Sequence, residues 1–185
     1  MKILHICDTP ENLMDLGDLA SMKLELVLTS GDLPRPIYDR IRAKLPDVPL
    51  YGVRGGHDGP TELTAAEDLH LRVIEIGGLK VAGFQGSWRY KPAGRYLYTD
   101  NEVSVALSRF PNVDVLVTHN PPALDGHELL DDIHNGFTSF VEYCARSGVK
   151  YLFHGHSSVE KQTRMGATLV IGSYGRRVID LPDWK

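Results

Sequence analysis

The chain has 185 residues, of which 42% are hydrophobic and 24% are charged, and its formal net charge is −4. These are ordinary values for a globular protein, so they exclude a disordered chain, and the length predicts one domain over residues 1–185. Apolar runs are far shorter than the ~20 residues of a membrane helix, which argues against a membrane protein. The small acidic excess makes nucleic acid an unlikely partner, because its binders usually carry basic patches. Two cysteines, Cys7 and Cys144, are too few for a disulfide framework, so we expect a reducing, cytoplasmic environment.

The first half of the chain alternates short apolar runs with helical patterns. Ile37, Ile41 and Leu45 are spaced four apart, which predicts an amphipathic helix. Two glycines between apolar runs predict a hairpin turn at Gly77-Gly78. In chain order we expect a strand over Lys2–Cys7, a helix starting at Thr9-Pro10-Glu11, a strand over Leu24–Leu28, a helix over Pro36–Leu45, a strand over Leu50–Val53, and a hairpin of Leu71–Ile76 with Leu79–Phe84.

The second half continues this alternation and ends in hairpins. A capping-box pattern over Thr99–Glu102 predicts a helix that runs to about Arg109. Next we expect a strand over Val113–Val117, a helix over Gly136–Arg146 that stops at Gly148, a strand over Val149–Phe153, and two or three antiparallel strands between Val159 and Leu181. Strands and helices that alternate, followed by hairpins, predict an α/β chain with a mixed sheet or two packed sheets.

Aspartates and histidines follow five successive predicted strands. The carboxyl ends of strands in α/β sheets are where sites form, so these side chains are candidates for one site. Carboxylate oxygen and imidazole nitrogen are ligands for Zn, Mn or Fe at hydrolytic sites. The strand ends read Asp8, Ser30-Gly31-Asp32, Gly55-Gly56-His57-Asp58, Thr118-His119-Asn120 and His154-Gly155-His156.

In order and spacing these motifs resemble those of the calcineurin-like metallophosphoesterases, over nearly the whole chain. Three further stretches are similar to a small subgroup of that family: Gly86–Tyr90, Tyr98–Glu102 and Asp132–Phe137. The resemblance implies an α/β fold, a four-layer αββα sandwich of two mixed β-sheets flanked by helices.

The resemblance also implies a metal site. Asp8 matches a ligand of a first metal, Asp32 matches the bridging carboxylate, and His119 and His156 match ligands of a second metal. The implied cofactors are divalent ions, Mn or Zn, or else Fe, with one or two bound per chain. An alternative interpretation of Asp8 is a helix N-cap, because Thr-Pro follows it.

Further positions are candidates for catalysis and substrate binding. His57 matches a histidine that contacts the scissile phosphate and protonates the leaving group, and Asp58 matches the acid that orients it; a turn residue is the alternative for Asp58. Arg54 is a candidate phosphate contact or a strand-edge ion pair, and His134 a substrate or metal contact or an ordinary cap region. Arg89 lies in an aromatic-rich stretch that suits a phosphate attached to a ring, or else packs as a surface loop.

Three positions depart from the family motifs. Pro10 stands where the family has a histidine, Gly56 where it has an asparagine, and Ser158 where it has the last histidine. The second metal keeps three protein ligands, which is typical of a catalytic mononuclear site, whereas the first keeps two carboxylates. The side chains nearest the strand ends that could fill the gap are His134, His154 and Asn120.

The function that these motifs imply is metal-dependent phosphoester hydrolysis by activated water, on phosphodiester or phosphomonoester bonds of small or nucleotide-like substrates. The lost ligands leave an alternative open: a catalytically weak or inactive binding or scaffold module, to which the retromer subunit of this fold is similar. A nuclease is disfavoured by the net charge of −4. We expect a monomer or homodimer. His5, in the middle of the first strand, is interpreted as a hydrogen-bonded core histidine.

Overall fold

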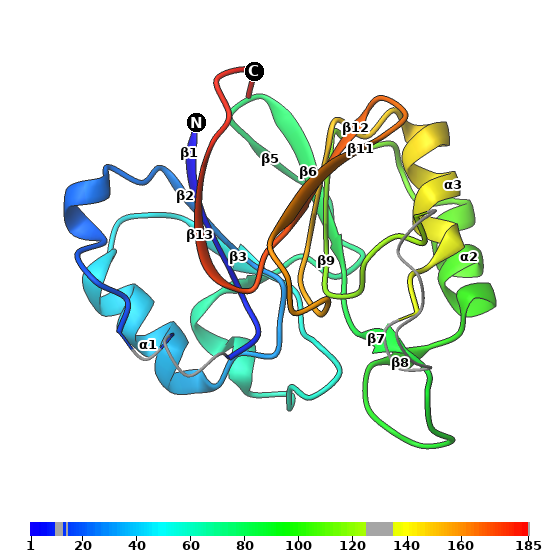
Figure 1. Cartoon of the computed structure of the whole chain (residues 1–185), viewed down its shortest axis with the longest axis horizontal. Coiled ribbons are helices and arrows are strands. Elements are labelled where there is room, and N and C mark those ends of the chain that lie inside the picture. The colour runs from blue at the N-terminus through cyan, green and yellow to red at the C-terminus, as the bar shows by residue number, and fades with distance from the viewer. Residues whose placement is uncertain (10–12, 14, 125–134, 185) are drawn as a thin grey trace.

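Two β-sheets face each other, with helices on both outer sides (Figure 1). The computed structural model describes residues 1–9, 13, 15–124 and 135–184. The first sheet has the strand order β13-β1-β2-β3-β4, and the second has the order β11-β12-β10-β9-β6-β5. In each sheet the central strands are parallel and an edge strand is antiparallel, so both sheets are mixed.

The strands of the first sheet are β1 (Lys2–Cys7), β2 (Leu26–Thr29), β3 (Leu50–Gly52), β4 (Glu67–Asp68) and β13 (Gly175–Asp180). Those of the second are β5 (Ile74–Ile76), β6 (Leu79–Phe84), β9 (Val115–Thr118), β10 (Tyr151–His154), β11 (Lys161–Met165) and β12 (Thr168–Gly172). A separate parallel pair is formed by β7 (Ser87–Trp88) and β8 (Leu97–Tyr98). The helices are α1 (Arg35–Lys44), α2 (Asp100–Ser108) and α3 (Thr138–Ser147), with 3-10 turns η2 (Ala20–Met22) and η3 (Glu62–Ala65).

The layers follow from alternation along the strands. Successive strand residues point to opposite faces, and both faces of each sheet are apolar. Ile3 and Leu28 join the core between the sheets, whereas Leu4 and Val27 join the core under α1. A third core, which includes Leu116, lies between the second sheet and the helices α2 and α3. The four-layer αββα sandwich is therefore confirmed.

Most expected elements are present with shifted bounds. The Gly77-Gly78 hairpin is present, the capping box of Thr99 with Glu102 begins α2, and Gly148 ends α3 in the left-handed region at φ 72°. The expected antiparallel tail is present as the hairpin of β11 and β12. The third strand, β13, crosses to the other sheet and pairs antiparallel with β1, while β12 also lies parallel to β10.

Some expectations lie outside the described residues, among them the helix start at Thr9-Pro10-Glu11 and the candidate His134. The strands β4, β7 and β8 were not predicted, because two-residue strands carry no periodicity. None of the helices in the described part of the chain is long and apolar enough to cross a membrane.

Candidate metal centre

The carboxyl ends of three central strands bring Asp32, His119 and His156 together. Asp32 follows β2 in the first sheet, while His119 and His156 follow β9 and β10 in the second. Each offers one ligand atom, and these atoms all lie within 4.8 Å of one another. The rings of His119 and His156 are tilted against each other with centroids 4.9 Å apart. The facing sheets thus place the three ligands of the expected mononuclear site at one point.

His119 is prepared for a metal by its hydrogen bonding. Its Nδ1 lies 2.6 Å from the carbonyl oxygen of Ser30, and because a carbonyl only accepts, Nδ1 carries the proton. The other nitrogen, Nε2, is fully buried and faces the Asp32 carboxylate, with Oδ2 at 3.3 Å. Metal-bound histidines typically donate their second N–H in this way. The residues present therefore fit a divalent cation.

Asp32 and His119 also shift each other's protonation. Burial alone would raise the pKa of Asp32, but the contact with His119 outweighs it and lowers this pKa to about 2. Burial alone would lower the pKa of His119, but Asp32 raises it to about 9. In the metal-free protein a proton is consequently held between the two side chains, in the position where a cation would share them.

Asp58 organises the loops that carry these ligands. Its carboxylate accepts hydrogen bonds from the backbone N–H groups of Asp32 at 2.8 Å, Gly55 at 2.7 Å and Leu33 at 3.1 Å. Burial raises the pKa of Asp58, whereas these bonds favour its ionised form. Asp58 thereby ties the loop after β3 to the loop after β2. Its expected role in orienting the His57 ring stays a prediction.

His57 lies at the surface beside the ligands. Its backbone N–H donates to Asp32 Oδ1 at 2.8 Å, and its side chain is exposed. The loop after β3 therefore presents an accessible imidazole next to Asp32, which is partly buried.

Asp8 supports the site from β1. Its backbone N–H donates to the Gly31 carbonyl at 3.0 Å, and its Oδ2 accepts from the His156 N–H at 3.0 Å. Burial raises the pKa of Asp8. Asp8 is not among the three side chains that meet within 4.8 Å, so its expected role as a ligand stays a prediction.

Four site residues have left-handed backbone conformations. Asp8, Asp32, His156 and Ser158 have φ values of 56°, 54°, 64° and 51°. This region costs non-glycine residues free energy, and such residues cluster at functional sites. Asp8, Asp32 and His156 are held by the backbone hydrogen bonds described above. The strained backbone at these strand ends is consistent with a functional site to which Asp32 and His156 contribute side chains.

The two expected arginine contacts have partners within the protein. Arg54 forms an ion pair with Asp68 and lies over the Tyr96 ring, 5.9 Å from its centroid. Arg89 donates to Glu102 Oε1 at 2.9 Å and to the Leu97 carbonyl at 3.0 Å. Contacts of either arginine with a substrate stay predictions.

Asn120, considered from the sequence as a replacement ligand, has its amide engaged. Its Oδ1 accepts from the Trp88 N–H at 3.2 Å, and its Nδ2 donates to the Asn135 carbonyl at 2.6 Å. Asn120, which directly follows His119, thus connects the backbones at Trp88 and Asn135 to this strand end. In the sequence, the signal for this structural role is that an asparagine directly follows the predicted ligand His119.

Gly56 faces a space that is already filled. A Cβ added at Gly56 would lie 2.5 Å from Ser87 Oγ and 3.6 Å from Leu97 Cδ2. Ser87 is 1% exposed and its hydroxyl has no hydrogen-bond partner in the described structure. The asparagine of the family motif would therefore not fit here unless Ser87 moved.

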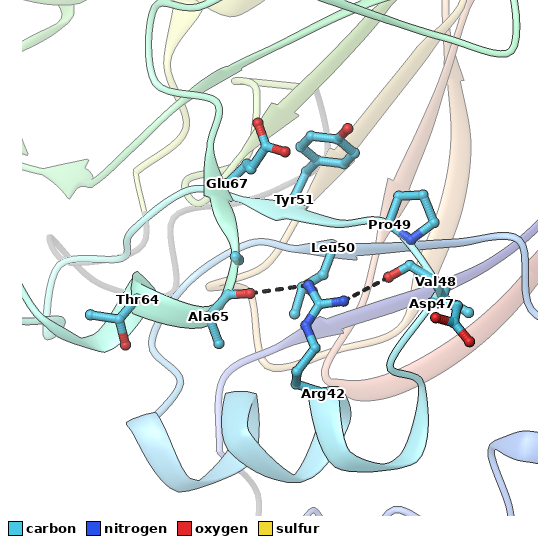
Figure 2. A pocket seen from close by; sticks show the side chains of 10 residues that line it. Arg42, Asp47, Val48, Pro49, Leu50, Tyr51, Thr64, Ala65 and Glu67 are labelled. Atoms are coloured by element: carbon cyan, nitrogen blue, oxygen red, sulfur yellow. Dashed lines mark hydrogen bonds between the residues drawn. The ribbon is translucent and has the colours of Figure 1, made fainter.

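A hollow of about 410 Å³ lies at the other end of β3, away from the ligands (Figure 2). Arg42 lines it from α1 and donates to the carbonyls of Val48 at 3.0 Å and Ala65 at 3.2 Å. Because the guanidinium is used for these backbone contacts, the hollow offers little free charge for an anionic ligand. Its lining residues are Arg42, Asp47, Val48, Pro49, Leu50, Tyr51, Thr64, Ala65, Ala66 and Glu67.

Neither the scan against protein-family models nor the search of curated proteins found a match. Solved structures do match. The Thermus thermophilus protein TT1561 has a TM-score of 0.69 and 14% identity, over 94% of this chain and 89% of that one. A candidate 5′-nucleotidase of Staphylococcus aureus, in complex with α-ketoglutarate, has a TM-score of 0.59 and 12% identity, over 100% of this chain but 51% of that one. Zinc-bound Vps29 of Entamoeba histolytica has a TM-score of 0.51 and 16% identity, over 95% and 74% of the chains. The chain therefore has the fold of the calcineurin-like metallophosphoesterases.

Proposed function

We propose that the chain is a metal-dependent phosphoesterase that hydrolyses phosphodiester or phosphomonoester bonds of small or nucleotide-like substrates. The observation that carries this proposal is the state of His119. Its Nδ1 donates to a carbonyl, while its buried Nε2 faces the Asp32 carboxylate at 3.3 Å, close to His156. A divalent cation would replace the proton between these two side chains and bind both, with His156 as a third ligand.

Asp32, His119 and His156 would hold the cation, with Mn or Zn as the expected identity. A bound divalent ion supplies Lewis-acid chemistry, which polarises water and a phosphoryl oxygen. The protein would keep the three donors together through hydrogen bonds of Asp58 to Asp32, of Ser30 to His119 and of Asp8 to His156.

His57 would supply the proton chemistry. Its ring is exposed, while its backbone is fixed to Asp32, so the imidazole can reach a phosphate held at the ligands. There it would stabilise the charge that develops on the phosphoryl group or protonate the leaving oxygen.

A second candidate is a binding module without turnover. The observation that favours it is Gly56, since the space for the missing asparagine is filled by Ser87. The likeness to Vps29 adds a fold neighbour whose crystals contain zinc. On this proposal the metal would stabilise the loops, and the same edge of the sheets would contact a partner.

One set of variants separates the two candidates. The protein is loaded with Mn²⁺ or Zn²⁺, desalted, analysed for metal content, and assayed with bis(p-nitrophenyl) phosphate and p-nitrophenyl phosphate. We expect Asp32→Asn to lose both metal and turnover. His57→Ala should keep the metal and lose turnover by about 10²–10⁴-fold. Asp47→Asn, exposed and at the opposite end of β3, is the matched control and should change neither.

The outcomes are distinct. Turnover that survives both chelation and His57→Ala would overturn the proposed mechanism. Retained metal without turnover on either ester would favour the binding module. Near one ion per chain supports the three-residue site, and near two implies that Asp8 and Asp32 hold another.

A further inference from the structure

A fully buried hydrogen-bonded chain of Ser173, His5 and Ser30, called the polar relay, lies beneath the metal centre. His5, in the middle of β1, is 0% exposed and points into the core between the sheets, where its ring packs edge-on against Phe153. Its Nδ1 lies 2.7 Å from Ser173 Oγ and its Nε2 lies 2.8 Å from Ser30 Oγ. Both serines are also 0% exposed. An imidazole among apolar residues is costly unless both nitrogens are satisfied, and here both are.

Ser30 connects this relay to the metal ligand. Its hydroxyl bonds His5, and its carbonyl accepts the proton of His119 Nδ1 at 2.6 Å. Its own N–H donates to the Ile6 carbonyl at 3.0 Å, so the residue is fixed at three points. The carbonyl of Ser30 is therefore aimed at His119 by contacts that lie beneath the site.

Ser173 connects the relay to the second sheet. Its N–H donates to the His154 carbonyl at 3.0 Å, at the end of β10 that carries His156. Its carbonyl accepts from Cys7 Sγ at 2.9 Å, in the residue before Asp8. His5 thus links the strand ends of both sheets at the level of the ligands.

We propose that His5 is a positioning residue of the metal centre, which holds Ser30 so that the His119 ring presents Nε2 to the ion. This inference rests on the metal site proposed above but not on hydrolysis. Burial, together with the nearby His154 and Arg177, lowers the pKa of His5 to about 3, so the ring stays neutral. A neutral ring offers one donor and one acceptor, which suits two serine hydroxyls.

The test measures binding of Co²⁺ alone to the full chain, from the visible absorption spectrum of the bound ion. His5→Leu should lower the affinity by about 10–100-fold, as expected when a contact behind a ligand is lost, and should change the shape of the spectrum. His5→Gln places an amide near the Nε2 position and should keep the affinity and spectrum. His5→Asn places it near Nδ1, toward Ser173, and should behave like His5→Leu.

Two further variants keep the test decisive. Ser30→Ala removes the hydroxyl but keeps the carbonyl, so it breaks the same link even if His5→Leu fails to fold. Val115→Ala lowers stability in the same core, at the start of β9, and should leave the spectrum unchanged. The inference is overturned if His5→Leu or Ser30→Ala binds Co²⁺ as the wild type does, if Gln and Asn are equivalent, or if the wild type binds no ion. If the variants bind Co²⁺ as expected but the protein has no phosphoesterase activity, the proposed function is overturned and the positioning role of His5 stands.

Discussion

Mild acid should weaken the fold through His5. Burial keeps this ring neutral in the folded protein, with a pKa lowered to about 3, against 6.5 for an ordinary histidine. Below pH 6.5, His5 binds a proton in the unfolded chain, whereas in the folded chain its ring stays neutral until the pH approaches 3. The stability that comes from the neutral ring is therefore complete above the unfolded pKa and is lost as the pH falls toward the folded one. Between about pH 7.5 and pH 5 the loss amounts to about 2 kcal/mol.

This effect is measured by urea unfolding at both pH values, for the wild type and for His5→Gln. The other titrating groups, such as His70 and Asp32, are common to both proteins, so the difference between the two pH dependences isolates His5. A loss of about 2 kcal/mol corresponds to roughly 1 M in the urea midpoint for an m-value of about 2 kcal/mol/M. The same decrease in both proteins would show that His5 titrates normally, and the reasoning from its burial would be wrong.

Three shorter predictions test the site and its frame. Gly56→Asn should lower the free energy of unfolding by about 1–3 kcal/mol, and adding Ser87→Gly should recover much of it; calorimetry would contradict the steric argument if the two effects simply added. Thr99→Ala removes the cap that Glu102 shares and should cost about 1 kcal/mol, read as a lower Tm. Metal affinity should rise roughly tenfold per pH unit between about pH 7 and 9, because an ion must displace the proton of His119; a titration series with a flat profile would contradict this.

The sequence predicted that Asp32, His119 and His156 would lie together, because each follows a buried strand, and the structure brings them together. Asp32, His119 and His156 are separated by up to 124 residues in the chain, yet parallel strands bring their carboxyl ends to one edge. The inter-sheet core also follows from alternation, since Ile3 and Leu28 point inward as the pattern requires. The strand pattern is enough to place a residue when its position depends only on the end of its own strand.

What the sequence could not supply are contacts that depend on two distant backbones. The carboxylate of Asp58 bonds the N–H groups of another loop, and a sequence motif shows only its neighbour His57. The return of β13 to β1 is likewise a choice between two sheet edges that a single strand pattern does not encode. The relay through His5 needed the structure for the same reason, because its partners are 25 and 168 residues away.

The left-handed backbone of Ser158 allows its effect on stability to be separated from any effect on metal binding. Its backbone has φ 51°, its side chain is exposed, and it stands where the family motif has a metal-binding histidine. Glycine would relieve about 1–2 kcal/mol of left-handed strain, but the greater freedom of the unfolded chain would cost about 0.4–1 kcal/mol. At the middle of these ranges, Ser158→Gly should stabilise the protein by about 0.8 kcal/mol. Urea unfolding and Co²⁺ binding should show higher stability with unchanged affinity. A weaker affinity would instead mean that the serine contributes to the metal centre, and an unchanged or lower stability would mean that this loop is not strained.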